Sequence, residues 1–248
     1  MSYNSTEPEE KGREKEKMKQ EREATFKLLI GTNGTGKSKI LKRFLALNKR
    51  NLICFPNSKD STWDSVKLID VDKILQTATG GKFFDFEQFF NTRSEKVLPM
   101  QQKIKKLLSH EIQTFTGDRK IRIKHPAIFK IIVDEDFGFF NGGLFLDDFK
   151  SCISHNNLPA HVRALLDSRR HYMVDIFAAT HAPKDIPPDF MSFNPDVYLF
   201  KTSGNFETAK HKYKRFEALL QAQEKINAFT DPNRPGYKPE DNFKFLKV

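Results

Sequence analysis

The chain has 248 residues, which suits one α/β domain with a small extension or, at most, two small domains. Its formal net charge of +10 suggests a polyanionic partner beyond a small ligand, most simply nucleic acid, although many small basic proteins are merely soluble. No apolar stretch approaches the roughly 20 residues that a membrane span requires. The two cysteines lack metal-ligand and disulfide spacing, and the N-terminus is charged where a signal peptide would be apolar, so we expect a cytoplasmic protein.

The first elements along the chain form a strand–loop–helix unit. Residues 1–23 carry six basic and seven acidic side chains and are predicted to be a disordered or fraying tail. A strand over 26–30 then leads into a glycine-rich loop, and a helix is expected from about Lys37. The apolar run 52–55 predicts a second parallel strand, which would close a βαβ unit with the first.

The glycine-rich loop fits the pattern G-x-x-x-x-G-K-[ST] without mismatch. Its glycines let backbone N–H groups point at phosphate oxygens, and the following helix adds its N-terminal dipole. Lys37 is expected to reach the β- and γ-phosphates, and the Ser38 hydroxyl to ligate Mg²⁺. The sequence therefore predicts a site for ATP and Mg²⁺ formed by Gly31, Thr32, Asn33, Gly34, Thr35, Gly36, Lys37, Ser38 and Lys39.

The middle of the chain contains the run that most resembles a buried strand. Residues 99–112 have helical spacing, and 119–124 alternate as a short strand with one basic face. The run 127–133 (AIFKIIV) predicts a strand that ends in two carboxylates. There Asp134 would hold Mg²⁺ and Glu135 would polarise the attacking water, with Asp136 as the next candidate. The alternative is an ordinary buried strand followed by a solvated turn.

Two further strands are expected nearer the C-terminus. The strand 172–178 precedes Thr180 and His181, and polar side chains at the carboxyl end of a central parallel strand lie in the ligand crevice. These two residues are therefore candidates for sensing the γ-phosphate or holding the water, although His181 could simply cap a turn. A strand over 196–201 would complete the sheet. The tail beyond Asn205 is basic around Lys210–Arg215 and is then predicted to be helical to about Ile226 before a proline-rich end.

These features predict an α/β P-loop NTPase with a central, mostly parallel, RecA/ASCE-like sheet flanked by helices. Residues 24–204 would form the ATPase domain, and residues 205–248 a basic C-terminal helix and tail. No Asn-Lys-x-Asp string of a GTPase is present, and nucleotide kinases usually lack a strand-terminal Asp-Glu pair. The pattern favours the ATPases that use a catalytic glutamate.

Residues Ser168–Tyr172 and Val174–Pro183 resemble the FtsK–HerA superfamily, in particular viral genome-packaging ATPases and the zonula-occludens-toxin-like ATPases of filamentous phages. The resemblance covers about residues 25–202. His181 stands where the family commonly has glutamine. The absence of a membrane segment favours the packaging branch over the toxin-like branch.

This resemblance implies a homo-oligomeric ring that hydrolyses ATP to move double-stranded DNA into a viral capsid, with capsid vertex proteins as possible partners. Arg169 or Arg170 would reach the ATP site of a neighbouring subunit, with Arg163 as a further candidate. The alternative is that these arginines belong to a solvated basic helix end. Non-specific DNA contacts are expected from Lys103–Lys106, Arg119–Lys124 and Lys210–Arg215. The rival functions are an assembly or secretion ATPase acting on protein, and a nucleotide-dependent switch with little turnover.

Overall fold

The computed structural model describes residues 23–48, 51–55, 61–80, 98–113, 120–123, 127–133, 139–151, 153, 158, 160–204, 206, 210 and 215–248. Its strands are β1 (Phe26–Ile30), β2 (Asn51–Phe55), β3 (Lys67–Leu68), β4 (Lys120–Arg122), β5 (Gly142–Asp147), β6 (Asp175–Thr180), β7 (Asp196–Phe200) and β8 (Phe245–Lys247). Its α-helices are α2 (Lys37–Leu47), α3 (Val71–Thr79), α5 (Leu98–Gln113), α6 (Ala127–Ile132), α7 (Ala160–Tyr172) and α8 (Phe216–Phe229).

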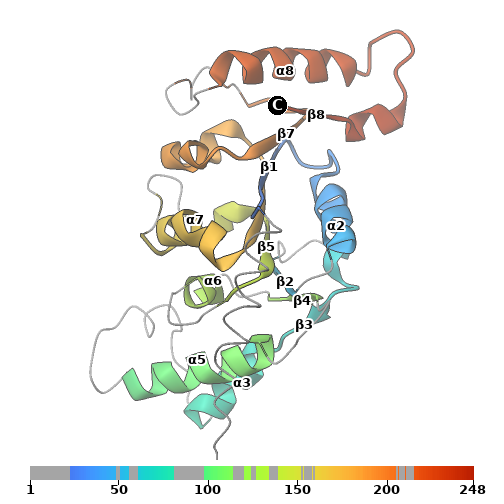
Figure 1. Ribbon diagram of the computed structural model, residues 1–248. Coiled ribbons are helices and arrows are strands. Elements are labelled where there is room, and N and C mark those ends of the chain that lie inside the picture. The colour runs from blue at the N-terminus through green and yellow to red at the C-terminus, as the bar shows by residue number, and fades with distance from the viewer. Residues whose placement is uncertain are drawn as a thin grey trace, which may run out of the picture.

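The described strands form one sheet with the order β3-β4-β2-β5-β6-β1-β7-β8. Every neighbouring pair is parallel except β7 and β8, which are antiparallel. Helix α2 lies on one side of this sheet and α6 and α7 on the other, while α8 lies near β7 and β8 at one edge (Figure 1). The predicted α/β P-loop fold is confirmed, and β6 lies between β1 and β5 as expected of a RecA/ASCE-like sheet.

The prediction that β1 and β2 close a βαβ unit is wrong, because β5 and β6 separate them in the sheet. Strands β5 and β6 are buried along their whole length. Strands that are covered on both faces belong at the centre of a parallel sheet, so the chain crosses two positions between β1 and β2.

The core has two parts, one on each face of the sheet, because successive side chains of a strand point to opposite faces. On β1, Leu28 and Ile30 pack into the larger cluster, and Leu29 packs into the cluster beside α2. In that second cluster, Phe145 of β5 stacks on Phe177 of β6, with ring centroids 4.2 Å apart. The central strands are thus held from both sides, which fixes their carboxyl ends.

The predicted strand over 127–133 is wrong: Ala127–Ile132 forms helix α6. Ile128, Ile131 and Ile132 are buried, a spacing that puts one helical face toward the core. A short apolar run has no period that separates a buried strand from a buried helix, which is the physical reason for the error. Asp134, Glu135 and Asp136, which follow this run, lie outside the described residues.

The prediction missed the central strand β5, whose sequence GGLFLD holds only three strongly apolar residues, as well as the short strands β3 and β8. Gly143 dilutes the signal for a structural reason. A Cβ atom there would lie 2.7 Å from Cδ2 of Leu52 on the neighbouring strand, so any other residue would force the Leu52 side chain to move. Strand β6 also begins later than expected, at Asp175, because α7 continues to Tyr172.

The C-terminal region extends the sheet. The predicted helix is confirmed as α8, and the chain then turns back through a 3-10 helix, η7 (Pro239–Phe243), into β8. Strand β8 pairs with β7 in the register Phe245 with Phe200, which brings the end of the chain beside the strand next to β1. Among the described residues, no helix combines the length and the apolar character needed to cross a bilayer.

Candidate nucleotide-binding site

The glycine-rich loop joins β1 to α2 at the carboxyl edge of the sheet and is anchored to two neighbouring strands. The Gly31 N–H donates to the Thr180 carbonyl at 3.2 Å, and the Thr32 N–H donates to the Lys201 carbonyl at 2.9 Å. Gly31 packs so closely that a Cβ atom would lie 2.6 Å from Cβ of Phe200. The loop is therefore held in place by the ends of β6 and β7.

Gly36 is the residue at which the loop becomes helix. Its φ of +87° is left-handed, a conformation that L side chains rarely adopt, and its carbonyl accepts the first helical bond from Ile40 at 3.1 Å. The helix thus starts with free N–H groups facing the pocket, as a phosphate site requires.

Lys37 is buried, with only 6% of its side chain surface exposed. Its ammonium donates to the carbonyls of Gly31 at 2.6 Å and Thr32 at 2.8 Å. Burial lowers the pKa of Lys37 to about 8, and Asp147 and Asp148 offset part of this effect. The lysine is folded onto its own loop, close to the position where a β- or γ-phosphate would replace the carbonyls as its partner.

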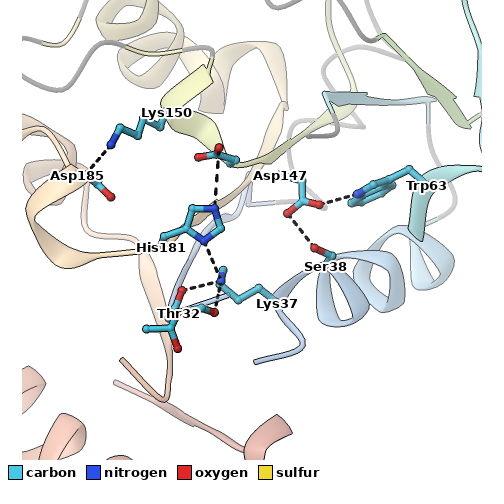
Figure 2. A network of polar contacts seen from close by, with 10 residues as sticks. Thr32, Lys37, Ser38, Trp63, Asp147, Lys150, His181 and Asp185 are labelled. Carbon is cyan, nitrogen blue, oxygen red and sulfur yellow. Dashed lines mark hydrogen bonds and ion pairs between the residues drawn. The ribbon is translucent and has the colours of Figure 1, made fainter. Parts of the chain in front are cut away.

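Asp147 ends β5 and takes the position that we predicted for Asp134. The Ser38 hydroxyl donates to Oδ1 of Asp147 at 3.1 Å, and the Trp63 indole N–H donates to Oδ2 at 2.6 Å (Figure 2). Trp63 belongs to a short 3-10 helix, η1 (Ser61–Trp63), and is fully buried. Two donors therefore hold the carboxylate against the first turn of α2.

The pair Ser38 and Asp147 has the chemistry of a Mg²⁺ site. Both side chains supply oxygen, and Mg²⁺ usually takes one or two protein oxygens while phosphates and water complete its shell. No cluster of three or more His, Cys, Asp or Glu side chains that could hold a metal by itself occurs in the described part of the chain. The residues present fit a metal that arrives with a nucleotide.

Asp148 and His181 form a second polar pair beside the loop. Asp148 has a φ of +72°, a strained conformation of the kind found at functional sites, and its Oδ2 lies 3.9 Å from Nε2 of His181. Nδ1 of His181 lies 3.4 Å from the Lys37 ammonium, which can only donate. Burial, then the Lys37 charge, lower the pKa of His181, and the Lys37 contact favours the tautomer in which Nδ1 carries no proton.

The pocket between these groups has a volume of about 440 Å³. The predicted residues Asn33, Gly34, Gly36, Lys37, Ser38 and Lys39 line it, as does His181. The sequence analysis missed Asp147, Asp148, Ser61, Thr62 and Phe243, which also line it. Asp147 and Asp148 could have been predicted, because they directly follow the apolar run Leu144–Leu146.

Thr180 ends β6, as predicted, but it is not among the residues that line the pocket. Its side chain is fully buried, and its hydroxyl finds no hydrogen-bond partner among the residues that the structure describes. Its carbonyl anchors Gly31, so Thr180 supports the loop, and His181 is the residue at the pocket.

Arg169 and Arg170 lie at the end of α7, before β6 begins, and so at the opposite edge of the sheet from the pocket, whereas Arg163 lies near the start of that helix. Arg169 is buried and donates to the carbonyls of Leu166 at 2.5 Å and Phe193 at 3.3 Å. Burial lowers its pKa. Arg163 is paired with Asp189, and Arg170 is exposed.

No protein-family model matches the chain, and no curated protein sequence matches it. The chain is similar in fold to solved structures. The genome packaging NTPase B204 from Sulfolobus turreted icosahedral virus 2, in complex with sulfate, is 11% identical, and the match covers 80% of this chain and 86% of that chain with a TM-score of 0.50. The same protein in complex with ATP-gammaS is 13% identical, with 82% and 85% coverage and a TM-score of 0.49. The predicted likeness to a viral genome-packaging ATPase is confirmed at the level of the fold.

Proposed function

We propose that the protein binds a nucleoside triphosphate with Mg²⁺ and hydrolyses it. The observation that carries this proposal is the 3.1 Å contact between Ser38 on the glycine-rich loop and Asp147 at the end of β5. It joins a phosphate-binding loop to a carboxylate at the spot where a bound nucleotide would present its β- and γ-phosphates. Ser38 and Asp147 would hold Mg²⁺, whose role when bound is to neutralise phosphate charge.

Lys37 would leave the carbonyls of Gly31 and Thr32 and contact the β- and γ-phosphates. Asp148 is our candidate for accepting the proton of the attacking water, because it follows Asp147 directly and lines the same pocket. His181 would orient Asp148 through its Nε2 proton and contact the γ-phosphate or the water. Glu135 remains a proposed alternative base.

We further propose that hydrolysis moves double-stranded DNA, as part of genome packaging, in a homo-oligomeric ring. Support comes from the net charge of +10 and from the likeness in fold to a protein named as a genome packaging NTPase. Exposed Lys103 and Lys106 on α5 are candidates for phosphate contacts, whereas the guanidinium of Arg122 on β4 is paired with Asp64 at 2.6 Å. Capsid vertex proteins are proposed partners of such a ring. The segment Lys210–Arg215 lies largely outside the described residues.

In a ring, Arg170 is our candidate for the arginine that reaches a neighbour's γ-phosphate. Its side chain is exposed, whereas the guanidinium of Arg169 is already engaged by two carbonyls of its own chain. We therefore assign Arg169 a structural role.

The test is ATP hydrolysis by the full chain with and without linear duplex DNA, over a series of salt concentrations, beside native mass measurement of the assembly. Lys37→Ala is the control for contaminating ATPase. We expect DNA to raise the wild-type rate and salt to reduce that effect as phosphate contacts are screened. Hydrolysis that DNA does not change at low salt would favour the protein-assembly ATPase, and binding without turnover would favour the switch.

A further inference from the structure

Phe243 is an exposed aromatic side chain at the mouth of the nucleotide pocket. It ends η7, far from the glycine-rich loop in sequence, yet it lines the same pocket as Lys37 and Asp147. It keeps 43% of its surface exposed, although a phenylalanine gains free energy from burial. Its exposed surface is therefore available to a ligand in this pocket.

The ring lies directly against the loop. A Cβ atom on Gly36 would lie 3.0 Å from Cδ1 of Phe243, so one edge of the ring touches the loop backbone. The Lys39 ammonium lies 4.6 Å from the ring centroid. Phe243 thus lies beside the loop that would hold the phosphates and lines the same pocket, so the base of a bound nucleotide could reach it.

The segment that carries Phe243 is fixed on both sides. Before it, the buried Asp241 carboxylate accepts from the Lys238 N–H and from Nη2 of Arg234, each at 3.0 Å. After it, Phe245 pairs with Phe200 on β7, and their ring centroids are 5.2 Å apart. A ring held in this way loses little conformational freedom when a planar ligand stacks on it.

We propose that Phe243 is the platform on which the nucleotide base stacks, so that the C-terminal segment completes the binding site. This inference rests on the proposed nucleotide binding and adds the base subsite to it. Stacking needs only a π-face, so the platform would accept any base and favour the larger surface of a purine over a pyrimidine. The Lys39 ammonium lies over one face of the ring, so a base would stack on the opposite face or displace the ammonium from it.

The test compares Mg-ATP with inorganic triphosphate, which has no base, by calorimetry on the full chain. Wild type should bind ATP more tightly than triphosphate. Phe243→Ala should weaken ATP binding about 5- to 150-fold and leave triphosphate binding unchanged, and Phe243→Trp should keep the ATP affinity. Phe140→Ala is the matched control, since Phe140 is 53% exposed and is not among the residues that line the pocket.

Equal ATP affinity in wild type and Phe243→Ala, or equal affinity of wild type for both ligands, would overturn the platform. If Phe243→Ala binds neither ligand, the substitution has disturbed the loop. Phe243→Leu, which keeps an apolar contact with Gly36, then tests whether the aromatic ring itself binds the base. If the ratio of ATP affinity to triphosphate affinity is lower in Phe243→Leu than in wild type, the platform is supported. If the two ratios are equal, the platform is refuted. Failure of wild type to bind either ligand would refute the nucleotide site itself.

Discussion

Asp147 accepts structural hydrogen bonds, and we propose that it also holds Mg²⁺. Replacing it by asparagine separates these two roles, because the substitution removes the charge and keeps the shape of the side chain. The asparagine oxygen can accept the Trp63 indole N–H, and its amide can donate to the Ser38 hydroxyl, so both contacts have a replacement. Asp147→Ala instead leaves the buried indole N–H without its acceptor. We expect the alanine variant to lose about 1–3 kcal/mol of unfolding free energy and the asparagine variant to lose less.

The effect of Asp147→Asn on activity should be much larger than its effect on stability. A metal held by a carboxylate supplies several kcal/mol of transition-state stabilisation, and about 3 kcal/mol corresponds to a factor of more than 100 in rate. We therefore expect kcat to fall at least about 100-fold in Asp147→Asn. Nucleotide binding should lose its dependence on Mg²⁺ for the same reason.

Three measurements check this reasoning: denaturant unfolding followed by circular dichroism, ATP binding with and without Mg²⁺, and phosphate release. Asp134→Asn is the matched control and should behave as wild type. Normal turnover by Asp147→Asn, with loss of turnover by Asp134→Asn, would return the metal-binding role to Asp134 and refute the site as described.

Three further predictions concern the loop lysine, the loop glycines and the arginines. Because the pKa of Lys37 is about 8 and only its charged form attracts phosphate, Mg-ATP affinity should be highest below pH 8 and fall as pH rises through 8; a flat calorimetric affinity from pH 7 to 9 would contradict this. Gly36→Ala should lower the melting temperature more than Gly34→Ala, since both force a side chain into a left-handed conformation but only the first meets Phe243. Arg169→Ala should lose about 1–3 kcal/mol of stability in denaturant unfolding. Arg170→Ala should fold normally but hydrolyse ATP poorly, and mixing it with Asp147→Asn should restore activity if Arg170 acts across a subunit boundary; no recovery would refute that role of Arg170.

Local sequence was enough to identify the elements whose signal lies in consecutive residues. The glycine-rich loop is one uninterrupted motif, and the flanking strand and helix have clear apolar periods, so β1, the loop and α2 were predicted with nearly correct bounds. The strands β2 and β7 and the helices α5 and α8 were found for the same reason. The prediction of a nucleotide site on an α/β fold therefore rested on short-range information.

The tertiary structure decided which carboxylate faces the loop. The run 127–133 is more apolar than Gly142–Asp147, yet only the second is a strand, paired with β2 on one side and β6 on the other. Asp147 meets Ser38 across 109 positions of sequence and Trp63 across 84. Phe243 reaches Gly36 only because β8 pairs with β7. Such contacts depend on the order of strands in the sheet, which follows from how whole faces pack together, and no local pattern of residues carries that information.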